Sequence, residues 1–195
     1  NVSAETIEKM KEYLHENGLH DVLVSVNQYK PQDVWKRTFT NPKTSLLSKV
    51  LVGIPTSLIE TFAFPKLSGF PGDHYNLSSN TVHIFSNNTA LALHECGHAK
   101  DLNSRENPTL YGIIRSLPYV GSIGGLYQEY QASNNAIVYL REKKWDTLLA
   151  SSFKVLIPAY ASYFAEAVLP SIGFQEAQRI GRFCSDRFVI FFPSA

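Results

Sequence analysis

Apolar and polar positions recur with two different periods near the start of the chain. Ile7, Met10 and Leu14 stand three or four residues apart, and the helix that this spacing predicts ends at Gly18. In residues 22–26 every second residue is instead valine, which is the period of a strand. The chain is therefore expected to begin with a helix followed by a strand.

Prolines break the pattern between residues 31 and 72, so any helices there are expected to be short. The most favourable stretches are residues 46–52 and 56–62. After this region, residues 81–85 are predicted to form a compact strand. The polar cluster at residues 86–88, Ser-Asn-Asn, can cap a helix that follows it directly.

Helical spacing dominates the rest of the chain. A proline-free helix is predicted for residues 89–103, and a longer one with a basic last turn for residues 126–144. The remainder keeps a helical pattern, with interruptions expected at Pro158, Pro170 and Gly173. Together these elements predict a mostly helical α+β fold with a small sheet.

The length of the chain limits the number of domains, and its net charge limits the classes of binding partner. The 195 residues fit a single domain spanning residues 1–195. Because 18 Lys and Arg face 17 Asp and Glu, the net charge of +1 gives no broad electrostatic footprint, and neither nucleic acid nor a membrane is an expected partner. The chain stops at Ala195 soon after the apolar run 188–192, and we expect it to be cut from a longer protein at this end.

Three features bear on the compartment. Cys96 and Cys184 are far apart in the sequence, which argues against a disulfide framework. The polar N-terminal stretch has no apolar segment after a basic start, so no signal peptide is expected and the cytoplasm is the default location. The apolar segment 155–172 has Glu166 as its one charge, but its prolines favour a core helix over a membrane span.

The clearest chemistry lies in the motif His94-Glu95-Cys96-Gly97-His98. In a helix, positions i and i+4 lie about 40° apart around the axis and one turn apart along it, so His94 and His98 can share one metal ion. Zn²⁺ accepts imidazole nitrogens and takes about three protein ligands when it is catalytic. Glu95 lies beside the pair and can be the catalytic base, whereas Cys96 points away as a small buried hydrophobe.

A third metal ligand has to come from another part of the chain. Asp101 lies on the same helix face as His94 but about 10 Å further along the axis, so a supporting role suits it better. Glu129 stands on the next long helix, after enough chain for that helix to turn back beside the first. We therefore predict Glu129 as the third ligand, with Glu106 and Glu142 as weaker alternatives.

The His-Glu-x-Gly-His motif, the sequence Glu-Tyr-Gln-Ala at residues 129–132 and the small polar Ser133 together resemble the gluzincin metallopeptidases. The resemblance covers roughly residues 94–136. It implies a zincin-like domain with an HExxH active-site helix, and an endopeptidase in which Glu95 activates a zinc-bound water. Many members have Asp where this chain has Ser133; that Asp orients a ligating histidine. A serine supplies no charge, which leaves open whether Asp101 substitutes for it.

The position of the motif near residue 95 and the lack of an export signal are also similar to bacterial effector metalloproteases that act inside host cells. This resemblance implies secretion into a host cell cytosol, a role in virulence, and a protein or peptide substrate. It further implies actin as that substrate. Composition and spacing alone name no substrate.

Parts of the expected mechanism stay open at the level of the sequence. A second donor to the oxyanion is usual in such sites, and Tyr119, Tyr127 and His74 are all candidates. Strand 81–85 either presents an edge to an extended substrate or is an internal strand. Two other functions compete with the peptidase: a non-catalytic zinc-containing protein-binding module, and a zinc hydrolase of non-peptide bonds.

Overall fold

The computed structural model describes residues 1–62, 72–106 and 120–168. These residues are mostly helical with one small three-stranded sheet, which confirms the α+β class at this coarse level. The strands are β1 (Leu23–Val26), β2 (His74–Asn76) and β3 (Thr81–Ile84). The helices are α1 (Ala4–Glu16), α2 (Pro31–Thr40), α3 (Leu46–Ser48), the π-helical turn η1 (Lys49–Gly53), α4 (Ile54–Phe62), α5 (Thr89–Asn103), α7 (Val120–Glu142) and α8 (Asp146–Val168).

The sheet has the strand order β1-β3-β2, with β1 parallel and β2 antiparallel to β3. Strand β3 therefore has a partner on both sides. The hypothesis that residues 81–85 offer an edge to a substrate is wrong, because backbone pairing already uses both edges of β3. Among the described strands, β1 and β2 each pair with a neighbour on one side alone. Of these two edge strands, β2 contacts the motif helix α5.

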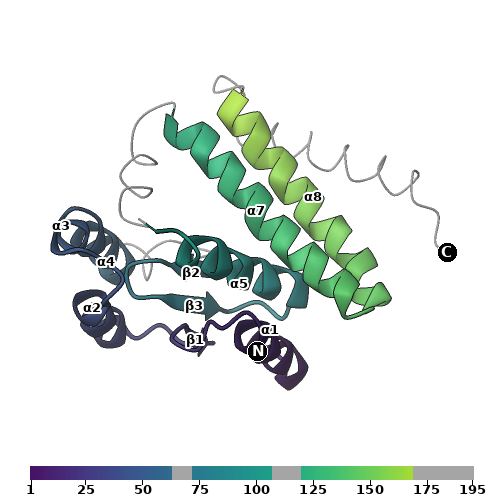
Figure 1. The fold of residues 1–195 in the computed structure, drawn as a ribbon, viewed down its shortest axis with the longest axis horizontal. Helices are drawn as coiled ribbons and strands as arrows, with labels where there is room; N and C mark the ends of the chain where they lie inside the picture. Colours follow the sequence, from purple (N-terminus) through teal and green to yellow (C-terminus); the bar gives the residue numbers. More distant parts are fainter. Residues whose placement is uncertain (63–71, 107–119, 169–195) are drawn as a thin grey trace.

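One face of the sheet is apolar and carries α5. Side chains alternate between the two faces of a strand, so Val82 and Ile84 of β3 point together into a core that also contains Leu93 and Cys96 of α5. Helices α1, α7 and α8 complete this core, and α7 and α8 lie side by side across α5 (Figure 1). This packing holds the motif helix between the sheet and the two long helices.

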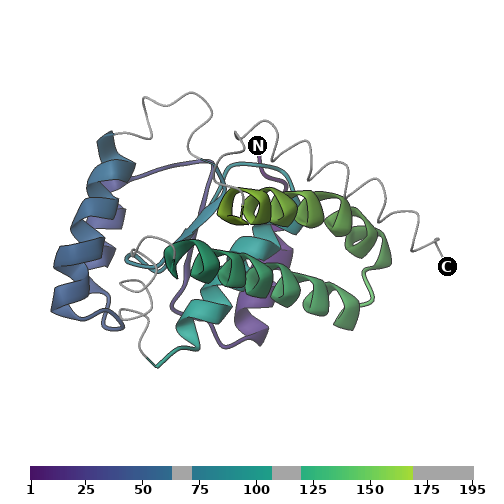
Figure 2. The same ribbon diagram turned by 90° about the horizontal axis from the view of Figure 1, so that it is seen from above.

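The opposite face of the sheet is polar. His83 of β3 points to this face, where its ring lies 5.6 Å from the ring of Tyr29 and 4.8 Å from that of His74. Glu60 of α4 accepts hydrogen bonds from Tyr29 Oη at 3.1 Å and Asn76 Nδ2 at 2.7 Å. Helices α2, α3 and α4 gather at this end of the molecule, apart from α7 and α8 (Figure 2).

Several predicted elements are confirmed. Helix α1 ends at Glu16, just before Gly18, and α5 has the predicted bounds of residues 89–103. The interruption predicted at Pro158 is wrong, because α8 continues through it to Val168. Helix α8 packs against α5 and α7, and this packing supports the helix where proline removes one backbone hydrogen bond.

Other predictions about the late chain have mixed outcomes. Pro170 and Gly173 lie outside the described residues. The apolar segment 155–172 falls partly on α8, where Leu156 is buried in the core. Among the described helices, none has the length and apolar character required to cross a membrane.

Candidate metal centre

Helix α5 begins with a strong cap and is buried along most of its length. The side-chain Oδ1 of Asn88 accepts hydrogen bonds from the backbone N–H groups of Ala90 and Leu91 at 3.0 and 3.3 Å. The helix then buries small and apolar residues together with His94 and Glu95, of which the exposed fractions are 7% and 9%. Two buried polar side chains on a core helix require partners.

Helix α7 places one carboxylate against both histidines of the motif. Glu129 Oε2 lies 3.1 Å from Nε2 of His94, and Glu129 Oε1 lies 3.5 Å from Nε2 of His98. The two imidazole rings stand nearly perpendicular, with centroids 4.7 Å apart. One ligand atom from each of the three residues lies within 4.8 Å of the other two, so this group could hold one metal ion.

The close approach of α7 to α5 depends on Gly97. A Cβ atom at this position would lie 2.4 Å from the carbonyl oxygen of Ala132 on α7, which is far inside van der Waals contact. Asn135 reinforces the contact, because its Nδ2 donates to the Gly97 carbonyl oxygen at 3.3 Å. The glycine inside the motif therefore lets the backbone of α7 come near enough for Glu129 to reach both histidines.

Ser133 orients the first histidine. Its Oγ lies 3.1 Å from Nδ1 of His94, on the opposite side of the ring from the nitrogen that faces Glu129. Asp101 does not take this role, since both of its carboxylate oxygens lie 2.9 Å from Nη2 of Arg105. The serine is thus the group that fixes the His94 ring.

The Glu129 carboxylate is electrostatically adapted to its two neighbours. Burial raises the pKa of Glu129, but hydrogen bonds and Coulombic attraction from the rings of His94 and His98 outweigh burial and hold this pKa well below its usual range. The carboxyl group therefore stays ionised at neutral pH, as a metal ligand has to be.

The two weaker alternatives for the third ligand do not join the group formed by His94 and His98. Glu106 and Glu142 are both exposed, and among the residues described by the structure the group of His94, His98 and Glu129 is the one arrangement that could hold a metal ion. Cys96 is completely buried in the core, as predicted, and burial raises the pKa of its thiol far above the ordinary value. Cys184 lies outside the described residues.

Glu95 lies beside the group at the wall of an open cavity of about 490 Å³. Residues from three parts of the chain line this cavity: Gly72, Asp73, Phe85, Ser86, Leu91, His94, Glu95, Leu156, Ala159 and Tyr163. Much of the lining is apolar, and the polar groups gather near the motif. A ligand in this cavity would therefore meet the Glu95 carboxyl and the His94 ring together.

Among the described residues, two of the three oxyanion donors that the sequence suggested are absent from the lining of this cavity. Tyr119 lies outside the described residues, and Tyr127 and His74 are not among the lining residues. The Nδ1 atom of His74 instead lies 2.8 Å from the carbonyl oxygen of Gly72. The tyrosine at the wall is Tyr163 of α8, which sequence reasoning missed because an interruption was expected at Pro158.

Asp73 also lines the cavity, and it was missed as well. One oxygen of its carboxylate accepts hydrogen bonds from the backbone N–H groups of Phe85 and Ser86 at 2.7 and 2.9 Å, and the other accepts from the Ser86 hydroxyl. These bonds fix the turn between β3 and α5 that borders the motif. The signal available in the sequence was an aspartate just before a short strand, followed later by the Ser-Asn-Asn cap at residues 86–88.

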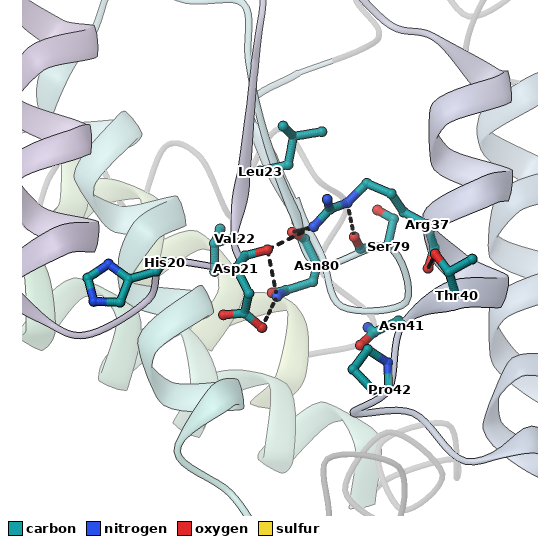
Figure 3. A pocket seen from close by; sticks show the side chains of 10 residues that line it. All are labelled: His20, Asp21, Val22, Leu23, Arg37, Thr40, Asn41, Pro42, Ser79 and Asn80. Carbon is teal, nitrogen blue, oxygen red and sulfur yellow. Dashed lines mark hydrogen bonds between the residues drawn. The ribbon is translucent and has the colours of Figure 1, made fainter.

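A separate cavity of about 390 Å³ lies between β1, α2 and the turn before β3 (Figure 3). Arg37 lies at its wall and donates to three backbone carbonyl oxygens: those of Ser79 and Asp21 at 2.8 Å and that of Asn80 at 3.3 Å. The guanidinium is therefore engaged in holding α2 against the sheet.

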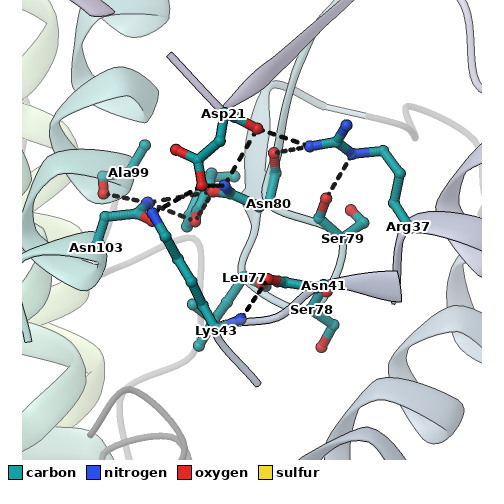
Figure 4. Close-up of polar contacts among 11 residues, drawn as sticks. Asp21, Arg37, Asn41, Lys43, Leu77, Ser78, Ser79, Asn80, Ala99 and Asn103 are labelled. Carbon is teal, nitrogen blue, oxygen red and sulfur yellow. Dashed lines mark hydrogen bonds and ion pairs between the residues drawn. The ribbon is translucent and has the colours of Figure 1, made fainter. Parts of the chain in front are cut away.

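The same polar network extends to the end of the motif helix (Figure 4). The Asp21 carboxylate pairs with Lys43 at 2.8 Å and accepts a hydrogen bond from Asn80 Nδ2 at 3.1 Å. Asn103 of α5 donates to Asn80 Oδ1 at 3.2 Å. This network anchors the C-terminal end of α5 to the sheet, which is a structural task that supports the metal centre.

Comparison with known proteins adds no assignment. No family model, no curated protein and no solved structure matches this chain. The function therefore has to be argued from the geometry and chemistry of the site.

Proposed function

We propose that the chain is a zinc-dependent metallopeptidase of the gluzincin type, with a zincin-like fold around the HExxH helix. The observation that carries this proposal is the convergence of His94, His98 and Glu129 beside the buried Glu95. A structural zinc site normally has four protein ligands, whereas a catalytic one has three and keeps an open position. Three donors, of which His94 lies at the wall of an open cavity, fit the catalytic kind.

The donor set suits zinc. Two imidazole nitrogens and one carboxylate are the ligands found in one common class of catalytic zinc sites, while Mg²⁺ and Ca²⁺ prefer oxygen alone. When bound by these three residues, Zn²⁺ would polarise a substrate carbonyl and lower the pKa of a water near it. The Ser133 hydroxyl would keep the His94 ring in the orientation that presents Nε2 to the ion.

Glu95 is the base in this proposal. Its carboxylate takes a proton from the attacking water and then delivers that proton to the nitrogen of the departing amine. Tyr163 supplies a hydroxyl at the same cavity, and we assign it to the carbonyl oxygen on which negative charge develops. The apolar part of the lining, including Leu156, excludes water from the rest of a bound peptide.

The substrate that we propose is a protein or peptide, with actin as the first protein to test because bacterial effector metalloproteases are similar in motif position. The experiment begins with metal analysis of the purified chain, where we expect about one zinc per chain. The chain and its Glu95→Gln variant are then incubated with actin and with a cell lysate, and new N-termini are mapped by mass spectrometry.

The outcomes separate the competing functions. New termini that need both zinc and Glu95 support the peptidase. One zinc per chain without any new terminus contradicts it and favours a non-catalytic module or a hydrolase of another bond. A chain without bound metal removes the basis of the proposal.

A further inference from the structure

The segment α3–η1–α4 has its polarity reversed relative to an ordinary surface helix. Its inner side buries small or polar residues, namely Ser48, Gly53, Ser57 and Glu60. Its outer side exposes large apolar residues, which we call the apolar face: Leu46, Leu47, Val50, Leu51, Leu58, Ile59 and Phe62. The exposed fractions of these side chains run from 42% for Leu58 to 77% for Leu46. Clustered exposure of this kind marks a surface that another phase or molecule covers.

The inner contacts prevent the segment from turning its apolar side inward. A Cβ atom on Gly53 would lie 2.7 Å from Thr38 Cγ2, so α2 and η1 are already in close contact. Ser57 Oγ lies 3.5 Å from Thr38 Oγ1. Glu60 is held by Tyr29 and Asn76 through both carboxylate oxygens. The orientation of the apolar face is therefore a fixed property of the fold.

Basic residues prevail in the sequence within and just before the apolar face. Between Asp33 and Glu60 the sequence contains four charged residues, all basic: Lys36, Arg37, Lys43 and Lys49. Arg37 is directed toward the sheet, and Glu60 is 3% exposed. Lys43 pairs with the Asp21 carboxylate at 2.8 Å, so the local excess of positive charge comes from Lys36 and Lys49. The neutral average charge of the whole chain hides this local excess of lysine beside exposed aliphatic side chains.

The shape of the surface favours a bilayer over a folded protein. A protein interface centres on pockets that receive anchor side chains. Among cavities that the described residues line, those of about 390, 200, 240 and 490 Å³ contain none of the residues of the apolar face in their lining. Helices α3 and α4 stand at one end of the molecule, away from α7 and α8 (Figures 1 and 2). Protruding aliphatic side chains with lysines beside them match the headgroup and acyl boundary of an anionic membrane.

We propose that the apolar face of α3–η1–α4 docks the protein on the surface of anionic lipid bilayers. The aliphatic side chains enter the boundary between headgroups and acyl chains, and Lys36 and Lys49 meet the lipid phosphates. The protein lies on the membrane without crossing it. This inference goes beyond the proposed peptidase function and does not rest on it, because binding is measured without cleavage.

The test is flotation of the full chain with two kinds of vesicle. One kind is pure phosphatidylcholine, and in the other about a third of the lipid is phosphatidylserine. We expect roughly tenfold more protein on the anionic vesicles, and a loss of this binding in the variant Leu47→Glu/Leu51→Glu. The variant Lys36→Gln/Lys49→Gln should lower binding to anionic vesicles by roughly tenfold, because each lysine near the surface contributes to attraction.

A matched control separates membrane contact from a general effect of added charge. Val138 on α7 is an exposed apolar residue far from this segment in sequence, and Val138→Glu should bind vesicles like the unchanged chain. Circular dichroism establishes that each variant is folded. Absent or equal binding to both kinds of vesicle overturns the proposal. Light scattering tests the alternative that a second copy of the chain covers this face. A dimer that dissociates in the Leu47→Glu/Leu51→Glu variant, together with no binding to vesicles, overturns the membrane proposal in favour of that alternative.

Discussion

Two pairs of imidazoles in this molecule each lie beside a partly or fully buried carboxylate, and the two pairs differ in geometry. His94 and His98 stand nearly perpendicular at 4.7 Å, and both face Glu129. His74 and His83 stack almost parallel, at 18° and 4.8 Å, and one of them approaches a carboxylate, with His74 Nε2 3.8 Å from Oε1 of Glu60.

The secondary structure explains the difference. Residues four apart on a helix can turn the edges of their rings toward one point, and ring nitrogens bind along those edges. His74 and His83 are register partners on antiparallel strands, so their rings stack face to face and their nitrogens do not converge. Two histidines and a glutamate are therefore a candidate metal site only where the backbone lets their ligand atoms meet.

The pKa values of Glu129 and Glu60 are shifted in opposite directions. Burial raises the pKa of both, but two rings at 3.1 and 3.5 Å outweigh burial at Glu129 and lower its pKa below the ordinary value. At Glu60, burial prevails over His74 and the hydrogen bonds from Tyr29 and Asn76, so the pKa is raised. The first group is prepared for a cation, whereas the second holds α4 to the sheet.

The largest effect is expected for Glu95→Gln. The substitution keeps the shape of the side chain but removes the carboxylate that accepts a proton, so the cleavage rate should fall by about 10²–10⁴-fold. Metal content should stay unchanged, because none of the three proposed ligands is altered. Cleavage rate and zinc content are measured on the same preparation, and a variant that cleaves at the original rate contradicts the peptidase assignment.

Glu129→Ala tests the comparison directly, with Glu60→Ala as its matched control. Removing a ligand from a three-ligand site should weaken zinc binding by at least about 10²-fold and abolish activity. Glu60→Ala should keep the metal and lose thermal stability, because Tyr29 and Asn76 lose a buried partner. Competition with a chelator measures the affinities. Equal zinc retention in both variants would show that Glu129 is not a ligand.

Tyr163→Phe is expected to lower kcat by about 10²-fold with little change in KM, because the hydroxyl acts on charge that develops in the transition state. The control is Tyr160→Phe one turn earlier on α8, where the ring packs against Tyr130. That variant should cleave like the unchanged chain. If the two variants behave alike, Tyr163 has no part in the reaction.

The sequence predicted the parts of the candidate site that depend on local spacing. Helix α5 has its predicted bounds because the Asn88 cap and the proline-free run are local features. The pairing of Glu129 with the motif was also anticipated, although the contact needed Gly97 to let α7 approach. Tyr163 could not be placed, because its position depends on how α8 continues past Pro158 and packs.

The polar face of the sheet was not predictable in the same way. Strand β2 has three residues, His74–Asn76, too few to show a period. Its pairing with β3 is fixed by contacts that join distant parts of the chain, such as Asn76 with Glu60. Local sequence patterns carry no information about such contacts. The pair of His74 and His83 could therefore be identified only from the structure.

The smallest effect concerns acid stability and the second imidazole pair. Burial, together with the nearby His74, lowers the pKa of His83 from 6.5 to about 3, and neither ring nitrogen has a hydrogen-bond partner among the described residues. The folded chain therefore binds fewer protons than the unfolded chain between about pH 3 and pH 6.5. Within this window the free energy of unfolding should fall as the pH falls, by up to about 1.4 kcal/mol per pH unit.

The variant His83→Gln has a neutral side chain across this range, so it should remove the contribution of His83 to the slope of unfolding free energy against pH. The control variant is His20→Gln, at an exposed residue, and it should leave the contribution of His83 in place. Denaturant titrations at several pH values, with a chelator present so that metal loss at His94 and His98 does not contribute, measure the slopes. Equal slopes for the His83→Gln variant and the unchanged chain would show that the ring titrates normally.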